Sequence, residues 1–202
     1  MAVGEGTSAA TVRLATPADG AACAAIYAPY VLKSAISFEL EPPSEGEMAA
    51  RIERVTAHWP WVVVEVGGVV RAYAYGTRHR ERAAYDWTSE TTVYVDGAFR
   101  GRGLGRIAMR ALVAVLRVQG FHLLVAGITA PNPGSLRLHE SLGFGRVGEF
   151  DAIGWKSGAW HGVEFWALEL GPRDAVPEPV TPITRLAGTP ELEAALRGQR
   201  GA

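Results

Sequence analysis

The feature that most constrains this chain is a glycine-rich segment between a predicted strand and a predicted helix. The segment FRGRGLGRIAMR covers residues 99–110, follows the strand pattern TTVYV at 91–95, and opens a helix predicted over 103–119. The first N–H groups of a helix have no partner inside it, and the helix dipole adds partial positive charge there. Glycines remove the Cβ atoms that would keep a bound group at a distance. The segment, with its arginines, therefore predicts a site for an anion.

Nucleotides are two alternative ligands for such a segment, and the sequence argues against both. The dinucleotide-binding fingerprint needs a third glycine where Arg106 stands, and it usually follows the first strand of its unit, whereas three strands lead up to this loop. A P-loop ends in Gly-Lys-Ser or Gly-Lys-Thr, which the chain lacks. A plain glycine turn without a ligand stays open as an alternative.

The order of the predicted elements indicates a mixed α/β protein. Thr16 is predicted to cap the first helix, a capping box of Ser44 and Glu47 the second, and Gly67–Gly68 is predicted to turn a hairpin. The expected elements are a strand at 11–15, a helix at 16–31, a helix after Ser44, strands at 61–66, 69–76 and 91–95, a helix at 103–119, a strand at 122–128, a helix at 134–142, and strands at 144–154 and 160–170.

The two ends of the chain differ in composition from the part between them. Residues 1–10 are small and polar and are expected to form a flexible tail, whereas 11–170 form the single domain. Residues 171–202 are rich in proline and lack a hydrophobic period, so they are expected to form a tail outside the core. A short helix at 191–199 is possible within this tail.

Composition and charge narrow the classes of partner. Twenty basic side chains against twenty-one acidic ones argue against a general nucleic-acid binder. No apolar run approaches the about 20 residues of a membrane span, so no membrane partner is expected. The single cysteine, Cys23, forms neither an internal disulfide nor a cysteine cage for a metal, and no metal is expected. The N-terminus lacks a signal-peptide pattern, so a cytoplasmic location is expected.

The glycine segment and its place in the chain resemble one superfamily. RGRGLG at 100–105 is similar to Arg/Gln-x-x-Gly-x-Gly/Ala, the coenzyme A pyrophosphate loop of the GNAT superfamily of acetyl-CoA-dependent N-acetyltransferases. In that superfamily the loop joins the fourth strand to the third helix, which is its predicted position here. Asn132 and LHESLGF at 138–144 are similar to the later motif of the superfamily.

Three further segments resemble one family within it. AYDWTSETTVYV at 84–95, APNPGSLRLHESLGF at 130–144 and GWKSGAWHGVEFWALEL at 154–170 together are similar to the phosphinothricin N-acetyltransferases, which include methionine sulfoximine acetyltransferases. The resemblance runs from about Val12 to Leu170. It implies a single-domain GNAT acyltransferase fold, with a mixed, mostly antiparallel sheet and helices on both faces, and it implies a homodimer.

Acetyl-CoA is the co-substrate that the resemblance implies. The glycine loop would hold its pyrophosphate, and its pantetheine arm would lie along residues 93–95 as an added strand does. Asn132 would contact the arm, although a turn residue between two prolines is the alternative. The implied cofactor residues are Val93, Tyr94, Val95, Arg100, Gly101, Arg102, Gly103, Leu104, Gly105, Arg106 and Asn132.

Two residues are candidates for proton transfer. Glu90 stands at the family's catalytic glutamate and would deprotonate the substrate ammonium, directly or through a water; a solvated glutamate at the start of a strand is the alternative. His139 stands where many GNAT enzymes carry a tyrosine that protonates the leaving thiolate. Its role as acid, second base or orienting group stays open, and so does a purely structural role. HES is not the zinc motif H-E-x-x-H, because position 143 is glycine.

The charged segment RHRERAAYDW at 78–87, shortly before Glu90, is expected to determine substrate specificity. Guanidinium groups suit a carboxylate or a phosphinate, and the alternative for this segment is a solvated charged loop. With the resemblance, which places family substrate positions at Arg82, Tyr85 and Phe38, the expected substrate residues are Phe38, Arg80, Arg82, Tyr85 and Thr92.

The resulting hypothesis is direct transfer of acetyl from acetyl-CoA to the α-amine of a small amino-acid-like compound. Phosphinothricin and methionine sulfoximine or sulfone are the compounds that the resemblance suggests. A different amino acid, a polyamine or a protein N-terminus is the alternative substrate. A non-catalytic acetyl-CoA-binding regulator is the alternative of another class.

Overall fold

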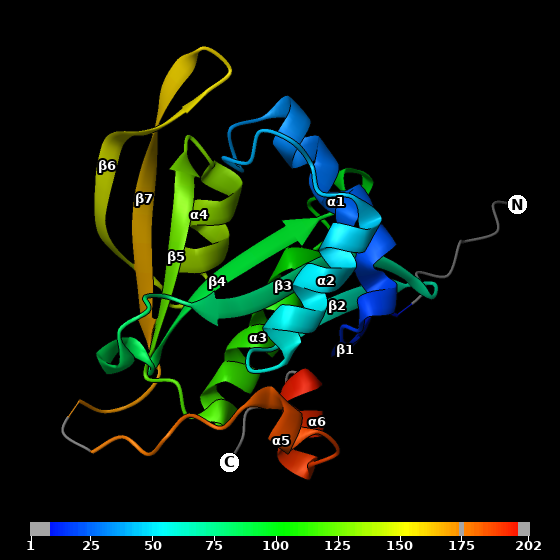
Figure 1. Cartoon of the computed structure of the whole chain (residues 1–202), viewed down its shortest axis with the longest axis vertical. Helices are drawn as coiled ribbons and strands as arrows, with labels where there is room; N and C mark the ends of the chain where they lie inside the picture. Colours follow the sequence, from blue (N-terminus) through cyan, green and yellow to red (C-terminus); the bar gives the residue numbers. More distant parts are fainter. Residues whose placement is uncertain (1–8, 174–175, 198–202) are drawn as a thin grey trace, which may run out of the picture.

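A seven-stranded sheet carries the rest of the structure (Figure 1). The computed structural model describes residues 9–173 and 176–197, so most of the predicted tail at 1–10 lies outside the described residues. The strands lie in the order β1-β2-β3-β4-β5-β7-β6. They are β1 (Thr11–Leu14), β2 (Trp61–Val66), β3 (Val69–Arg78), β4 (Thr88–Val95), β5 (Leu123–Ala130), β6 (Gly145–Lys156) and β7 (Ala159–Glu169).

One pair of neighbouring strands differs from all the others. Strands β4 and β5 are parallel, and every other neighbouring pair is antiparallel. Their pairing covers only 88–90 against 123–125, after which the two strands diverge (Figure 1). The mixed, mostly antiparallel sheet that was predicted is therefore confirmed, and its single parallel pair opens toward the C-terminal ends of both strands.

Helices cover both faces of the sheet, as predicted. Alternation along β2 sends Trp61 and Val63 into a core with α1 and α2, and Val62 and Val64 into a core with α3. The helices are α1 (Gly20–Lys33), α2 (Glu45–Thr56), α3 (Leu104–Gln119), α4 (Pro133–Glu140), α5 (Ile183–Leu186) and α6 (Pro190–Leu196), with short 3₁₀ turns η1 (Pro17–Asp19), η2 (Ala83–Tyr85) and η3 (Gly97–Phe99).

The predicted capping box and hairpin turn are confirmed, whereas Thr16 precedes the 3₁₀ turn η1 and Asp19 is the N-cap of α1. The Ser44 hydroxyl accepts from Glu47 N, and the Glu47 carboxylate accepts from Ser44 N, which is the predicted capping box. Gly67 and Gly68 have φ angles of +62° and +75°, which suit a tight hairpin turn. Strand β4 begins at Thr88 instead of residue 91, so Glu90 lies inside the strand, opposite Thr77 of β3.

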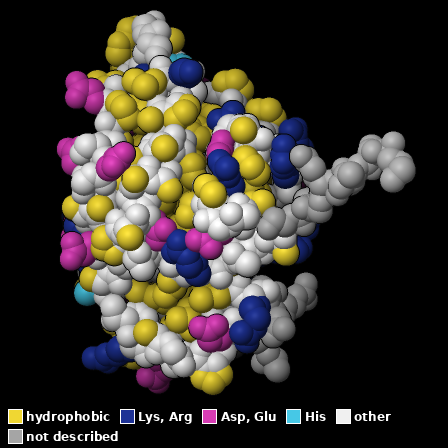
Figure 2. All heavy atoms as spheres, turned by 90° about the vertical axis from the view of Figure 1, so that its right-hand side faces the viewer, with side chains coloured by type: hydrophobic (Ala, Val, Ile, Leu, Met, Phe, Trp, Pro, Cys, Tyr) yellow, Lys and Arg dark blue, Asp and Glu magenta, His cyan; other side chains and the backbone are white. Residues whose placement is uncertain are grey.

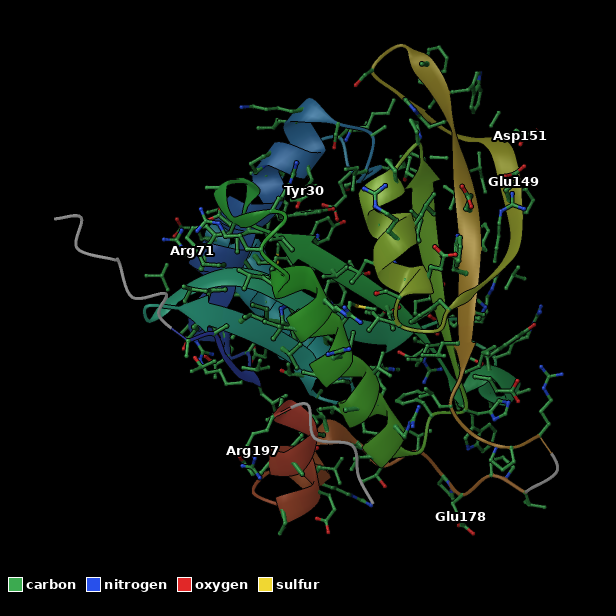
Figure 3. The ribbon with its side chains drawn as sticks, turned by 180° about the vertical axis from the view of Figure 1, so that it is seen from behind. Tyr30, Arg71, Glu149, Asp151, Glu178 and Arg197 are labelled. Carbon is green, nitrogen blue, oxygen red and sulfur yellow. The ribbon has the colours of Figure 1, made fainter. Side chains whose placement is uncertain are left out.

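The prediction of a C-terminal tail outside the core is wrong at its end. Ile183, Leu192 and Leu196 are buried in the core that contains α3. The Gln119 amide nitrogen at the end of α3 donates to the Thr181 carbonyl oxygen over 2.8 Å. Figure 3 shows Glu178 and Arg197 on this returning segment. Helix α6 (Pro190–Leu196) confirms the short helix that the sequence allowed at 191–199, whereas α5, with four residues, is too short to display a helical period.

Charges of both signs lie on the face that Figure 2 shows. On the side of the molecule where α1 lies, Figure 2 shows basic and acidic side chains scattered among hydrophobic ones. Within residues 9–173 and 176–197, no helix combines the length and the apolar character that crossing a membrane requires.

Candidate active site

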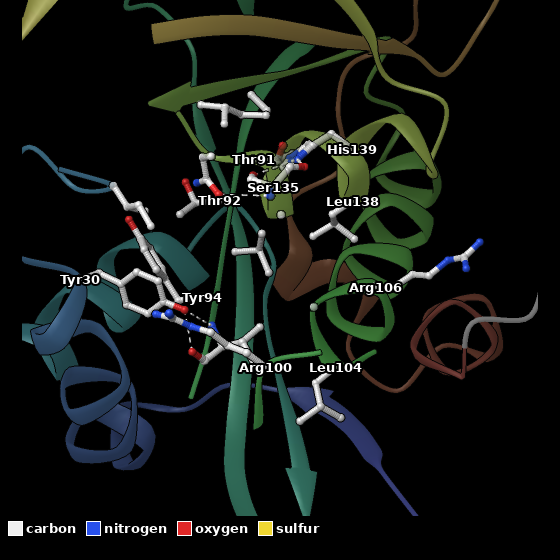
Figure 4. Close-up of a pocket in the computed structure, with 18 of the residues that line it drawn as sticks. Tyr30, Thr91, Thr92, Tyr94, Arg100, Leu104, Arg106, Ser135, Leu138 and His139 are labelled. Carbon is white, nitrogen blue, oxygen red and sulfur yellow. Dashed lines mark hydrogen bonds between the residues drawn. The ribbon is translucent and has the colours of Figure 1, made fainter. Parts of the chain in front are cut away.

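A cavity of about 530 Å³ opens where β4 and β5 part. Its walls come from β4, the start of α3, the divergent part of β5 and α4 (Figure 4). The structure thus brings together nearly all the predicted cofactor residues, with Arg102 left out of the lining. The predicted residues in the lining are Thr92, Val93, Tyr94, Val95, Arg100, Gly101, Gly103, Leu104, Gly105, Arg106, Asn132 and His139.

The start of α3 presents free backbone donors to this cavity. Gly101 and Gly103 have φ angles of +75° and +82°, which L side chains rarely adopt, and Gly103 is the N-cap of the helix. The first hydrogen bond of the helix runs from Ile107 N to Gly103 O over 3.1 Å. The N–H groups of residues 104–106 precede that bond, so they have no partner within the helix. This arrangement has the backbone geometry that favours an anion.

The edge of β4 is already occupied at one of the predicted positions. The Tyr30 hydroxyl donates to Val95 O over 2.6 Å and accepts from Val95 N over 3.2 Å (Figure 4). The next peptide faces β3, since Asp96 N donates to Arg71 O. By the alternation of a strand, Val93 faces the cavity like Val95. The backbone N–H and C=O of Val93 are therefore open to an added strand. Those of Val95 become available only if the Tyr30 hydroxyl gives up its two hydrogen bonds.

The arginine side chains of the glycine loop lie at the edge of the cavity and not inside it. The Arg100 guanidinium lies 4.6 Å above the centre of the Tyr30 ring. Arg102 lies 4.7 Å from the centre of the Phe99 ring, outside the cavity lining. Figure 4 shows the Arg106 side chain pointing away from the other labelled residues. The free backbone N–H groups at the start of α3 and the Arg100 guanidinium are thus the donors that this loop offers to the cavity.

His139 is held in one protonation state inside the cavity wall. Asn132 caps α4 by accepting from Ser135 N, and one turn after Ser135 the residue His139 is 2% exposed. The His139 Nδ1 lies 2.9 Å from the Ser135 carbonyl oxygen, which only accepts, so Nδ1 carries the proton. Its Nε2 is buried without a hydrogen-bond partner among the described residues. Burial lowers the pKa of His139, so the neutral imidazole offers a free lone pair on Nε2.

Glu90 does not line this cavity. Its side chain is 48% exposed, and its carboxylate oxygen Oε1 lies 2.9 Å from His79 Nδ1. Glu90 follows the alternation of Thr92 and Tyr94, and Tyr94 packs against the core of α1 and α2. His139 belongs to α4, whose Leu138 packs against the opposite core. The two candidate proton-transfer residues therefore come from opposite faces of the sheet.

Four of the five predicted substrate residues lie outside the cavity lining. Arg80 and Arg82 are exposed in the segment after β3, and the Tyr85 ring meets the His79 ring edge-on at 5.8 Å. Phe38 packs on the β6–β7 hairpin, where its ring leaves no room for a side chain at Gly154. Only Thr92 lines the cavity with the cofactor residues.

A buried lysine that the sequence analysis did not single out holds the loop that carries Phe38. Lys156 Nζ donates to Val31 O over 2.7 Å and to Ser37 O over 2.6 Å, and burial lowers the pKa of this amine. Tyr30 and His79 are two further residues of the site that were not predicted from the sequence. For His79 the sequence held one usable signal. Thr77 of β3 pairs with Glu90, and His79, two residues after Thr77, lies on the same face of the sheet as Glu90. The double contact of Tyr30 with Val95 joins residues 65 positions apart and leaves no sequence signal.

A metal site is absent from the part of the chain that the structure describes. No group of three His, Cys, Asp or Glu side chains within residues 9–173 and 176–197 is arranged to hold a metal ion.

Comparison with known proteins adds the family to this geometry. The family model described as the Acetyltransferase (GNAT) family matches residues 22–144. A phosphinothricin N-acetyltransferase from Streptomyces viridochromogenes is 41% identical over 175 residues, which cover 87% of this chain and 95% of the relative. An L-methionine sulfoximine/L-methionine sulfone acetyltransferase from Salmonella typhimurium is 36% identical over 161 residues, which cover 79% of this chain and 94% of the relative.

A solved structure agrees with these sequences. The crystal structure of a GNAT superfamily phosphinothricin acetyltransferase from Sinorhizobium meliloti, in complex with acetyl-CoA, superposes with a TM-score of 0.82. The two chains are 36% identical, and the match covers 87% of this chain and 97% of the other.

The lowered pKa of the buried His139 predicts how the stability of the fold changes with pH. Below about pH 6.5 the unfolded chain takes up a proton at this imidazole, and the folded chain resists it because its pKa is lowered. The free energy of unfolding therefore falls as pH falls through this range. In His139→Gln this contribution is gone, so the urea midpoint should fall less between about pH 7.5 and about pH 5.5 than in the wild type. An equal fall in both proteins would contradict a buried neutral imidazole.

Proposed function

Because the chain belongs to the Acetyltransferase (GNAT) family, we propose that it transfers acetyl from acetyl-CoA to the α-amine of a small amino-acid-like substrate. The observation that carries the proposal is the cavity between β4 and β5. The start of α3, with its free backbone donors, and His139 of α4 both line it. One end therefore suits a pyrophosphate, and the other suits proton transfer.

The residues that would hold acetyl-CoA fit its chemistry. The N–H groups of residues 104–106 suit the pyrophosphate, with Gly103 allowing close approach. The peptide of Val93 suits the amides of the pantetheine arm. Asn132 uses its side-chain oxygen to cap α4, which leaves its amide nitrogen for the arm.

Two groups of the chain, Glu90 and His139, carry the proposed proton chemistry, and the thiol of Cys23 takes no part in it. The ammonium of the substrate must lose a proton before its nitrogen attacks the thioester, and the Glu90 carboxylate takes that proton directly or through a water. His139 is neutral with its lone pair on Nε2, so in the resting state it accepts a hydrogen bond rather than donating one from that atom. Burial raises the pKa of the Cys23 thiol to about 12, which supports direct transfer without a cysteine relay.

The substrate class rests on the relatives and on two arginines. The two relatives above carry the names of phosphinothricin and of methionine sulfoximine and sulfone acetyltransferases. Arg80 and Arg82 are exposed and form no salt bridge with a described residue, so both guanidinium groups are open to a carboxylate or a phosphinate. Neither lines the cavity, so they would receive the distal end of the substrate on the side of Glu90.

A panel assay tests the function. Purified protein, acetyl-CoA and a set of amines are mixed, and release of the CoA thiol is followed. We expect turnover with methionine sulfoximine, methionine sulfone or phosphinothricin and none with a polyamine. Turnover with a polyamine or a peptide N-terminus alone would replace the proposed substrate class. Tight binding of CoA without turnover on any amine would favour a non-catalytic regulator.

The proposal includes a homodimer in the cytoplasm. Apolar side chains stand exposed on β6 and β7, at the end of the sheet: Phe150 is 57%, Trp155 58% and Trp160 61% exposed. Such a patch on a soluble enzyme favours contact with a second copy. Light scattering should give twice the mass of one chain, and cell fractionation should recover the protein with soluble enzymes. The mass of a single chain would contradict the homodimer. Recovery with membranes would contradict the cytoplasmic location.

A further inference from the structure

His79 stands beside the proposed base because of the register between two strands. Thr77 of β3 lies opposite Glu90 of β4, and Arg78 lies opposite Ser89. His79 follows β3 directly, and two residues along a strand return to the same face. His79 is therefore the diagonal neighbour of Glu90, at a separation that long side chains bridge.

The contact between the two side chains has a defined proton. His79 Nδ1 lies 2.9 Å from Glu90 Oε1. An ionised carboxylate only accepts hydrogen bonds, so Nδ1 must carry the proton that joins them. The His79 side chain is 19% exposed, and the Tyr85 ring packs edge-on against it at 5.8 Å. The imidazole is thus the better fixed partner, and the half-exposed carboxylate is the one that is oriented.

We propose that His79 is a positioning residue for Glu90, an inference that rests on the proposed function. Its Nδ1–H holds Oε1 of the carboxylate and leaves Oε2 to take one proton from the substrate ammonium, directly or through a water. The N–H bond of the ammonium breaks, an O–H bond forms at Oε2, and the amine keeps the electron pair. That pair forms the N–C bond to the acetyl carbon as the C–S bond breaks, and the leaving CoA thiolate takes the second proton of the amine to become the thiol. Glu90 then releases the proton on Oε2 to solvent, to which it is 48% exposed.

Variants that differ in one hydrogen bond test this role. Asparagine places an amide N–H near the position of Nδ1, glutamine places its amide near Nε2, and leucine has no donor. With the full chain and an amine that the wild type acetylates, we expect His79→Leu to lose about tenfold or more in kcat. We expect His79→Asn to regain most of that loss and His79→Gln to regain little. The KM for acetyl-CoA should stay within about twofold, because the start of α3 is unchanged.

A matched control is available elsewhere in the chain. His122 Nε2 lies 3.8 Å from Glu169 Oε1, which is a second histidine–glutamate pair, and neither residue lines the cavity. We expect His122→Leu to keep the wild-type kcat. Thermal unfolding of each variant shows whether it is folded, since a merely structural His79 would lower the melting temperature and kcat together in all three variants, without recovery in asparagine.

A double-mutant cycle shows whether His79 acts through Glu90. Glu90→Gln alone should lose about 100-fold or more in rate, and adding His79→Leu to it should cost little more, because the carboxylate to be oriented is gone. Fully additive losses would overturn the proposal. A kcat of His79→Leu equal to that of the wild type would also overturn it. A kcat above that of the wild type would overturn it too, and would show that His79 holds Glu90 away from the amine. If the wild type acetylates no amine at all, the proposed function itself fails, and this inference falls with it.

Discussion

The short parallel pairing of β4 with β5 is the constraint on which the rest of the site depends. The two strands share three residue pairs, ending at Glu90 and Val125, and then diverge. Beyond that point β4 keeps its partner on one side only, so its free edge and the start of α3 border the same cavity. A sheet that stayed paired would leave neither a strand edge for the amides of a ligand nor access between its faces. The active site is thus a consequence of strand geometry before it is one of side chains.

The alternation of β4 divides the chemistry between the two faces of the sheet. Val93 and Val95 pack against the core of α3, on the side that presents the anion site and His139. Tyr94 packs against the core of α1 and α2, and Glu90 has the same parity. A donor on the first side and an amine on the second meet only where the sheet is open. This arrangement supports the proposed direct transfer between two bound substrates.

Local features of the sequence predicted local structure, whereas contacts between distant parts of the chain were not predicted. The glycines before α3 and the capping box at Ser44 act within a few residues, so their residue types identify them. The clasp of Tyr30 on Val95 and the docking of Leu192 on the α3 core join distant parts of the chain, and single residues carry no mark of such partners. His79 lies between these cases, because correct strand register would have placed it beside Glu90.

The affinity for acetyl-CoA of two matched glycine variants tests the account most directly. Gly103 and Gly120 stand at the two ends of α3 with φ angles of +82° and +93°, and a Cβ at either position meets no heavy atom within 4 Å. Gly103→Val and Gly120→Val therefore carry similar backbone strain, but only the first places a side chain where the pyrophosphate is proposed to bind. Calorimetric titration should show binding weakened about tenfold or more in Gly103→Val and near the wild-type value in Gly120→Val. Equal affinity in the two variants would contradict the placement of acetyl-CoA in the gap between β4 and β5.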